Sequence, residues 1–387
     1  MPADKGASAQ YRTPVAENFP LDLVLPNFKK ACSLRYGENP GQPAAFYRQP
    51  DARGATMAHF EVLQEGKGLG YINLADMNLG QRVVERLSWL YGSHRQVCCI
   101  VKHEIPAGVA LGGDVESAFG QAWECDPLSA FGGVHVFSGT VGASLAEKLL
   151  EKGRNAEVVY APDFSCDALS VFQRRKDLRV VRMGHVNPAA DGGLDYKSVT
   201  GGMLVQQRFR SRINSSRDLT CVSEAQPSSD QSASAIFNWN VACFTRSNAV
   251  VIGSYFQTHG IGAGQQSRID AAFMAVRKAN GRDGSSKGLG SNGTFMASDA
   301  FMPEPDVVEL AAKHGSKDAT FHLTITQKIL ENTIMDDHSP LNESPMTQND
   351  DDSSSSDTIP IFSDEETEDF MGNHQIDLLN SPNIDLN

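Results

Sequence analysis

Two kinds of hydrophobic pattern alternate along the first half of the chain. From Asn73 to Leu90, apolar residues recur at close to helical spacing, so we expect a helix there, with Asn73 or Asp76 as its cap. A second helical stretch covers 142–152. Short apolar runs that are typical of buried strands lie at 97–101, 133–137 and 158–162. Strands that alternate with helices predict an α/β or mixed α+β fold instead of a β-sandwich or a helical bundle.

The second half of the chain repeats this alternation. Pro227 and Ser228 open an expected helix, and 248–256 is a strand candidate. The strand leads into GIGAGQQSR (260–268), where three glycines precede a helix that carries Arg268. Glycines let a backbone approach an anion, and a helix N-terminus offers unpaired N–H groups. A tight strand-to-helix turn explains the same glycines equally well, so both interpretations stay open.

Two segments carry too little apolar surface to form a core. Residues 208–234 are rich in Ser, Arg and Gln, and we expect a surface connection there. Residues 336–387 hold 14 of the 47 Asp and Glu residues and no Lys or Arg, which predicts a disordered acidic tail of unknown partner. Without those 14 acids, 33 Asp and Glu face 34 Lys and Arg. A body this close to neutral does not favour nucleic-acid binding.

Composition and motifs narrow the class of protein further. Hydrophobic residues make up 40% of the chain and charged residues 21%, which is typical of a globular protein. No apolar run reaches membrane-spanning length and the N-terminus lacks a secretory pattern, so we expect a cytoplasmic protein with no membrane partner. The seven cysteines show no CxxC spacing, and we expect reduced thiols. The sequence has no HExxH, GxSxG or zinc-deaminase pattern, so no metal is expected.

Lys102 and His103 are the first candidates for chemistry, because they follow an expected buried strand. In α/β sheets, ligands gather beyond the carboxyl ends of strands. A histidine can transfer protons near neutral pH, and an adjacent ammonium can stabilise developing negative charge. A strand-end lysine beside a solvated histidine explains the same dipeptide, so the pattern alone does not decide.

Eight collinear motifs strengthen the functional interpretation. They are LRYGENPGQPAAFY (34–47), GKGLGYINLADM (66–77), VKHEIPAGVA (101–110), DPLSAFGG (126–133), GGMLVQQ (201–207), SNAVV (247–251), GIGAGQQSRIDAA (260–272) and ASDAFMP (297–303). Over residues 33 to about 315 the sequence resembles the 5-aminoimidazole-4-carboxamide ribonucleotide (AICAR) transformylase portion of the bifunctional purine-biosynthesis enzyme. The resemblance implies two related cytidine-deaminase-like subdomains without zinc, at 33–207 and 235–335, preceded by an extension at 1–32. It also implies a homodimer whose active site crosses the interface.

The resemblance implies a reaction and a set of residues. The reaction is formyl transfer from the cosubstrate 10-formyltetrahydrofolate to the 5-amino group of AICAR. The implied catalytic residues are Lys102, His103 and Asn248, with His103 as the base that removes the amine proton. Implied nucleotide contacts are Arg35, Tyr36, Gly132, Glu157, Arg268 and Phe301, and implied folate contacts are Ile269 and Asp306.

The chain departs from the family pattern in two places. Only about 32 residues precede LRYG, so we expect no cyclohydrolase activity from this chain. The family sequence FFPFRD reads FMPEPD at 301–306, and neither a PGGS-type loop nor the closing Arg-His-Phe segment follows Gly315. The alternative hypothesis is therefore a catalytically impaired transformylase-like protein that binds a nucleotide or a partner.

Overall fold

The computed structural model describes residues 19, 21–52, 56–183, 193–209, 211–219, 221, 226–282, 288–299 and 305–314. The helices are α1 (Tyr71–Tyr91), α2 (Val115–Cys125), α3 (Pro127–Ala130), α4 (Ala143–Leu149), α5 (Cys166–Phe172), α6 (Ser229–Ala242), α7 (Arg268–Ala279) and α8 (Asp306–Lys313), with short 3-10 turns at Met57–His59 and Ser216–Asp218. The acidic tail expected at 336–387 lies outside the described residues. The expected mixed α/β fold is confirmed.

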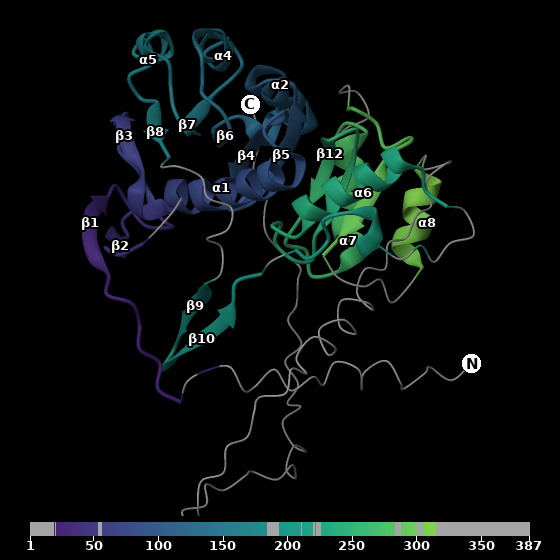
Figure 1. Cartoon of the computed structure of the whole chain (residues 1–387), viewed down its shortest axis with the longest axis horizontal. Helices are drawn as coiled ribbons and strands as arrows, with labels where there is room; N and C mark the ends of the chain where they lie inside the picture. Colours follow the sequence, from purple (N-terminus) through teal and green to yellow (C-terminus); the bar gives the residue numbers. More distant parts are fainter. Residues whose placement is uncertain are drawn as a thin grey trace, which may run out of the picture. The chain divides into compact units, whose positions relative to one another are not determined.

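One large mixed sheet organises these elements, with strand order β13-β11-β12-β5-β4-β6-β7-β8-β3 (Figure 1). Its strands are β3 (Glu61–Gln64), β4 (Gln96–Lys102), β5 (Ile105–Gly112), β6 (Gly133–Phe137), β7 (Ala156–Ala161), β8 (Arg179–Arg182), β11 (Val250–Ser254), β12 (Gln257–Gly262) and β13 (Phe295–Ser298). Two hairpins lie outside it: β1 (Lys29–Leu34) with β2 (Ala44–Arg48), and β9 (Leu194–Val199) with β10 (Gly202–Gln207).

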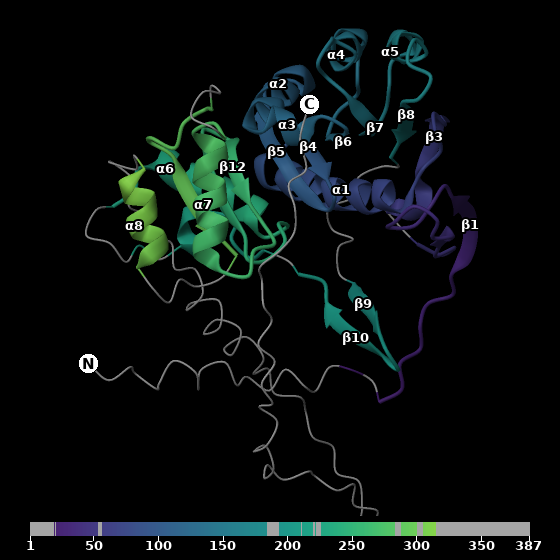
Figure 2. The same ribbon diagram turned by 180° about the vertical axis from the view of Figure 1, so that it is seen from behind.

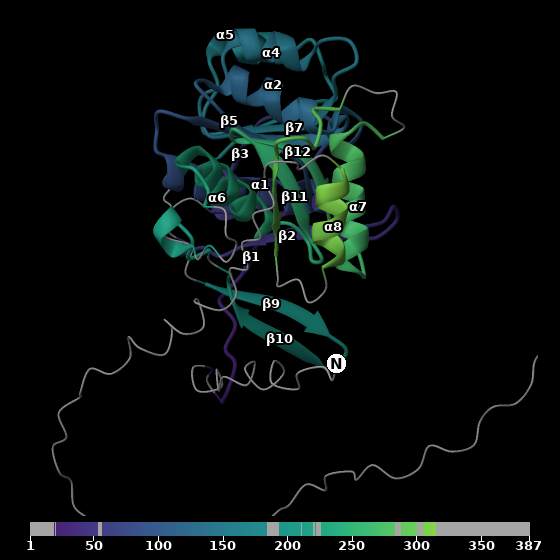
Figure 3. The same ribbon diagram turned by 90° about the vertical axis from the view of Figure 1, so that its right-hand side faces the viewer.

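Helices cover both faces of the sheet because its central strands are apolar on both sides. On β4, Val97, Cys99 and Val101 belong to the core cluster that contains residues of α1 and α6. The intervening Cys98 and Ile100 belong to the cluster formed with α2, α4 and α5. Successive strand residues point to opposite faces, so one strand contributes to both layers. Figure 3 shows the strands between these helix layers, and Figure 2 shows α8 beside α7 at the end of the sheet that carries β11.

The two halves of the sheet repeat one pattern. In the first half, α1 precedes the antiparallel hairpin β4–β5, then α2, and then β6 pairs with the outer side of β4. In the second half, α6 precedes the hairpin β11–β12, then α7, and then β13 pairs with the outer side of β11. The halves join where β5 pairs antiparallel with β12. The repeat therefore allows the two hairpins to be compared at equivalent positions, such as the turn between their strands.

The glycines of GIGAGQQSR serve close packing, which corrects the idea of a glycine loop. Gly260 and Gly262 lie within β12, and only Gly264 belongs to the connection that leads to α7. A Cβ at Gly262 would lie 1.9 Å from the Ala271 carbonyl oxygen, and one at Gly260 would lie 2.1 Å from the Ala275 carbonyl oxygen. Both clashes are with the backbone of α7. The absent side chains thus let α7 lie directly on its strand.

Candidate functional site

The edge of the sheet at the end of β4 collects most of the predicted site residues. Because β4 is antiparallel to β6 while β7 is parallel to β6, the end of β4 and the beginnings of β6 and β7 lie at the same edge. This places Lys102, Gly132 and Glu157 together. Arg35 reaches the same edge because its backbone N–H donates to the Leu69 carbonyl oxygen, just before α1 begins.

Lys102 is held beside Gly132. Its Nζ donates to the Phe131 carbonyl oxygen at 2.8 Å. Gly132 has φ of 77°, which favours glycine, and its N–H donates to the Asn155 carbonyl oxygen. A Cβ on Gly132 would lie 3.7 Å from the Lys102 Nζ. The ammonium group is therefore fixed next to bare backbone, where a ligand can approach closely.

Glu157 lies in a polar cluster with Tyr36 and Arg35 nearby. The Asn73 Nδ2 donates to a Glu157 carboxylate oxygen at 3.1 Å, and the Arg179 guanidinium lies 3.7 Å from the same oxygen. Arg179 also donates to the Gly68 carbonyl oxygen. The Arg35 guanidinium lies over the Tyr36 ring at 5.3 Å from its centroid. Carboxylate, guanidinium and phenol groups thus converge at one place, as a polar ligand requires.

His103 occupies a strained turn between β4 and β5. His103 and Glu104 have φ values of 55° and 57°, a conformation that costs a non-glycine residue about 1–2 kcal/mol. The buried Asp76 carboxylate accepts the backbone N–H of His103 at 3.2 Å and that of Glu104 at 2.5 Å. Burial raises the pKa of Asp76 to about 6, and the two N–H bonds oppose this rise. The His103 side chain itself is exposed.

Helix α1 begins at Tyr71 with Gly70 as its N-cap, which corrects the expected cap. Asn73 lies in the first turn, where its Oδ1 accepts the Gly70 N–H while its Nδ2 holds Glu157. Asp76 lies one helical turn further along α1, and its carboxylate accepts the backbone N–H groups of the hairpin turn at His103. Residues three apart share a helix face, so one face of α1 supports both parts of the site. In the sequence, the two polar residues of NLAD (73–76) were a sign of this supporting role. The same residue types are also typical of a helix N-cap, which is how they were interpreted.

A second group of predicted residues surrounds the start of β11. The Asn248 Nδ2 donates to the carbonyl oxygens of Gln265 and Gln266, both at 3.0 Å. Arg268 forms an ion pair with Asp299 at 2.6 Å and also contacts Ser298. Burial alone would raise the pKa of Asp299, but bonds from Ser247, the Ala249 N–H and Arg268 outweigh it and lower the pKa. Sequence reasoning did not single out Asp299, although it lies within the ASDAF motif.

Three predicted site residues remain, namely Ile269, Asp306 and Phe301. Ile269 is half-buried against the cluster between β11 and α7. Asp306 is exposed in the first turn of α8, where its carboxylate accepts the Val307 N–H. Phe301 lies outside the described residues.

The two groups share an edge but are separated along it. Since β4, β5, β12 and β11 are successively antiparallel, the end of β4 and the start of β11 face the same edge. Three strand spacings separate β4 from β11, which corresponds to about 14 Å at ~4.8 Å per strand. In this structure Lys102 and Asn248 of one chain therefore lie at separate positions along the edge, each with its own hydrogen-bond partners.

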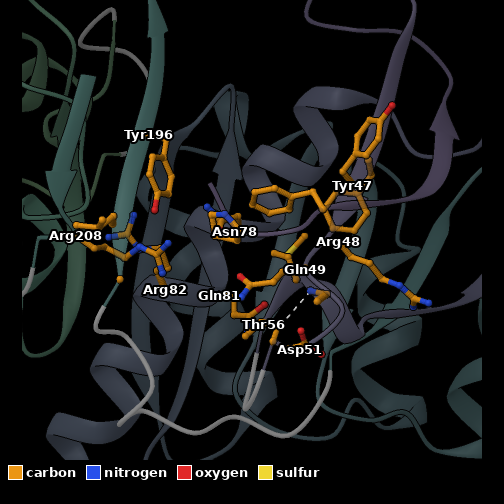
Figure 4. Close-up of a pocket in the computed structure, with 18 of the residues that line it drawn as sticks. Tyr47, Arg48, Gln49, Asp51, Thr56, Asn78, Gln81, Arg82, Tyr196 and Arg208 are labelled. Carbon is orange, nitrogen blue, oxygen red and sulfur yellow. Dashed lines mark hydrogen bonds between the residues drawn. The ribbon is translucent and has the colours of Figure 1, made fainter. Parts of the chain in front are cut away.

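A cavity of about 600 Å³ lies elsewhere, between α1, β2 and the β9–β10 hairpin. Figure 4 shows Arg82 and Arg208 directed into the same space as Asn78 and Tyr196. Asp51 and Glu85 also line it, so its charge is mixed. None of the residues predicted from the sequence lines this cavity. The candidate site is therefore the sheet edge at the end of β4 and not this cavity.

Two features are absent from the described part of the chain. Among the residues that the structure describes, no group of three or more His, Cys, Asp or Glu side chains is arranged to hold a metal ion. No helix in the described part of the chain combines the length and apolar character needed to cross a bilayer.

Comparison with known proteins agrees with the motifs that converge at this edge. The family model of the AICARFT/IMPCHase bienzyme matches residues 6–278. The chain belongs to this family. The match includes Lys102, His103, Asn248 and Arg268, and it ends within α7, before Phe301 and Asp306.

A curated relative shows how much of the family is represented here. The bifunctional purine biosynthesis protein PurH of Acidithiobacillus ferrooxidans is 40% identical over 317 residues, which are 81% of this chain. The chain spans 57% of that relative's length. The coarse class is thus a transferase family of purine biosynthesis, and the resemblance found in the motifs is confirmed.

Proposed function

We propose that the chain transfers a formyl group from 10-formyltetrahydrofolate to the 5-amino group of AICAR. The observation that carries the proposal is the convergence of Lys102, His103, Gly132 and Glu157 at one sheet edge, with Arg35 and Tyr36 beside them. In the proposal, Arg35, Tyr36, Gly132 and Glu157 bind the nucleotide. Family membership supports this assignment.

His103 and Lys102 have complementary roles in the proposed reaction. The 5-amino group is a weak nucleophile because its lone pair is delocalised into the ring and the carboxamide. His103 removes a proton from this nitrogen as the nitrogen attacks the formyl carbon. The Lys102 ammonium stabilises the oxyanion that forms and can protonate the leaving nitrogen of the folate. The exposed position of His103 at the sheet edge leaves its imidazole accessible to a bound nucleotide.

In the proposal, Asn248 and Arg268 approach the nucleotide from the second half of the sheet, and Phe301 also contacts the nucleotide. Ile269 and Asp306 contact the folate. Arg268 already has a carboxylate partner in Asp299. It therefore orients the loop at Asn248 and presents at most part of its guanidinium to a ligand. Asn248 lies just before β11, and its Nδ2 donates to the carbonyl oxygens of Gln265 and Gln266. One of these two bonds has to open before the amide can donate to the developing oxyanion.

A homodimer would bring Asn248 of one copy to Lys102 of the other. Exposed apolar side chains support a second copy as partner: Leu204 is 58% exposed on β10, and Val24 is 85% exposed before β1. Mixing Lys102→Met and Asn248→Ala subunits tests this arrangement. Random pairing makes half of the dimers mixed, and each mixed dimer has one intact composite site of two, so about one quarter of wild-type activity should return. No return of activity on mixing would show that each site belongs to one chain.

The transferase assay uses the full chain with AICAR and 10-formyltetrahydrofolate, with nucleotide binding measured by calorimetry in parallel. His103→Ala and Lys102→Met should abolish turnover and leave the melting temperature unchanged, because both side chains lie at the solvent edge of the sheet. Retention of most of the wild-type turnover by either variant would refute the proposed roles.

A second candidate function is nucleotide binding without turnover. The observation in its favour is that the nucleotide cluster is assembled on described residues, while the family match ends before FMPEPD at 301–306. Binding of AICAR by the wild-type chain without formyl transfer would favour this second function.

A further inference from the structure

The His103 turn is held by two hydrogen bonds to one buried carboxylate, and the internal repeat offers a second turn for comparison. The β11–β12 hairpin has the same kind of turn, with Tyr255 and Phe256 at φ values of 47° and 64°. There the Tyr255 N–H donates to the Ser234 hydroxyl of α6 at 3.3 Å. In this second turn the acceptor from the supporting helix is thus a neutral hydroxyl, and the Phe256 carbonyl oxygen also accepts the Leu111 N–H at 2.9 Å.

In the β4–β5 hairpin the acceptor at the equivalent position is a carboxylate, and it accepts two hydrogen bonds. Asp76 of α1 accepts both N–H groups of its turn, at 3.2 and 2.5 Å. The carboxylate is 3% exposed, and burial of a charge is costly unless it gains strong bonds. A hydroxyl would hold the turn without that cost, as Ser234 shows. The difference between the two hairpins is that only the first carries the candidate base.

We propose that Asp76 is a positioning residue for His103. Its carboxylate fixes both peptide groups that flank the His103 Cα on the turn, and so restricts the direction in which the imidazole leaves the backbone. The inference rests on the proposed function of His103 as the base. Asp76 does not touch the substrate, because its oxygens are occupied by the turn and its side chain is buried.

Charged and titratable groups near Asp76 come from the turn and from β4. His103 lies close enough to stabilise the Asp76 carboxylate, whereas Glu104 opposes its charge. Burial raises the pKa of the Cys99 thiol on β4, and the nearby Asp76 carboxylate raises it further. An Asp76→Asn variant removes the charge and keeps the size, so it weakens the hydrogen bonds to the turn with little change in packing.

The test compares Asp76→Ala, Asp76→Asn and the matched control Ser234→Ala in formyl-transfer kinetics. A misplacement of a catalytic group by about 1 Å can lower turnover about 100-fold. We expect a kcat loss of that order for Asp76→Ala, an intermediate loss for Asp76→Asn because its amide oxygen keeps one acceptor, and kcat within about 2-fold of wild type for Ser234→Ala. The KM for AICAR should change little in all three, since the nucleotide contacts lie on other elements.

A second readout does not depend on turnover. In protein with labelled histidine, the His103 imidazole resonance should shift and broaden in Asp76→Ala and stay unchanged in Ser234→Ala. An unchanged His103 resonance together with a kcat within about 2-fold of wild type in Asp76→Ala would overturn the inference. If the wild-type chain shows no transfer at all, the proposed function fails, and the resonance still decides whether Asp76 positions His103. Should Asp76→Ala fail to fold, Asp76→Asn carries both measurements.

Discussion

The pH dependence of stability should reveal two buried groups that act in opposite directions. Burial raises the pKa of Asp76 to about 6 and lowers the pKa of His135 to about 4. His135 lies on β6 with no exposed surface, packed against Phe119 and Trp123 of α2. Asp76 lies on the other side of the sheet, on α1. The two groups share no contact, so their effects should add.

The sign follows from the protons bound in each state. Between pH 4 and pH 6 the native chain binds more protons at Asp76 than the unfolded chain does, so the free energy of unfolding falls as the pH rises. Since the pKa of Asp76 rises from the ordinary aspartate value of 3.8 to about 6, this loss amounts to about 3 kcal/mol. At His135 the native chain binds fewer protons than the unfolded chain between about pH 4 and 6.5, so stability rises with pH, again by about 3 kcal/mol. In the wild-type chain the two effects nearly cancel.

Single substitutions should separate the two effects. We expect the free energy of unfolding of Asp76→Asn, taken relative to wild type, to rise by about 3 kcal/mol from pH 4 to pH 7. The corresponding difference for His135→Phe should fall by about 3 kcal/mol over the same range. The double variant should follow the wild-type curve with a constant offset. Urea unfolding followed by tryptophan fluorescence at several pH values measures each curve, and every constant packing effect of a substitution cancels in the pH difference. Parallel curves for wild type and both single variants would refute the assigned pKa shifts.

Three further predictions concern packing, the join between the halves and the tail. Gly262→Ala should lower the free energy of unfolding by about 3 kcal/mol or more, because the new Cβ would lie 1.9 Å from the Ala271 carbonyl oxygen, whereas Gly113→Ala, which meets nothing within 4 Å, should change the melting temperature little. Asp126→Asn should cost about 3 kcal/mol in urea unfolding because it leaves two cations of the second half without their buried carboxylate; an unchanged midpoint would contradict this. Removal of every residue after Met335 should leave nucleotide binding and transfer unchanged, since the acidic segment repels anionic ligands; a large loss in either assay would show that the tail contributes to the site.

Asp126 illustrates a contact that sequence reasoning did not find. It caps α3 through the Ser129 N–H, and it pairs with Lys278 at 3.4 Å and Arg282 at 2.6 Å from the second half. Burial alone would raise its pKa, but bonds from Arg282 and Ser129 outweigh burial and lower the pKa. The partners are more than 150 residues apart, and no local spacing indicates such a pair.

The local elements were predicted well because their signals are local. The strand runs at 97–101, 133–137 and 158–162 correspond to β4, β6 and β7, and Ser228 caps α6 as expected. The nine-stranded order could not be read from these signals, because the pairing of β5 with β12 joins segments that are remote in sequence. The domain boundaries remain predictions.

The sequence pointed to the residues of the candidate site but not to the residue that supports their position. Lys102 and His103 stood out because a basic pair followed an apolar run. Asp76 did not, since its role depends on a turn that is 27 residues away. The glycines before Arg268 were ambiguous for a related reason: a strand glycine and a phosphate-loop glycine look alike until the helix that lies against the strand is known.

The repeated halves suggest how one architecture can carry chemistry at a single hairpin. Both hairpins share the strained turn, the supporting helix and the glycine that admits the next helix: Gly108 approaches the Ala122 carbonyl as Gly260 approaches that of Ala275. The first turn has His103 and Glu104 where the second turn has two aromatic residues. Its supporting helix has Asp76 where the other helix has a serine. The second half instead supplies Asn248 and Arg268 at the opposite end of its hairpin, which reaches the same edge because β12 pairs antiparallel with β5. Joining two such halves through β5 and β12 therefore places the proposed base His103 and Asn248 along one edge, from non-equivalent positions of the same repeat.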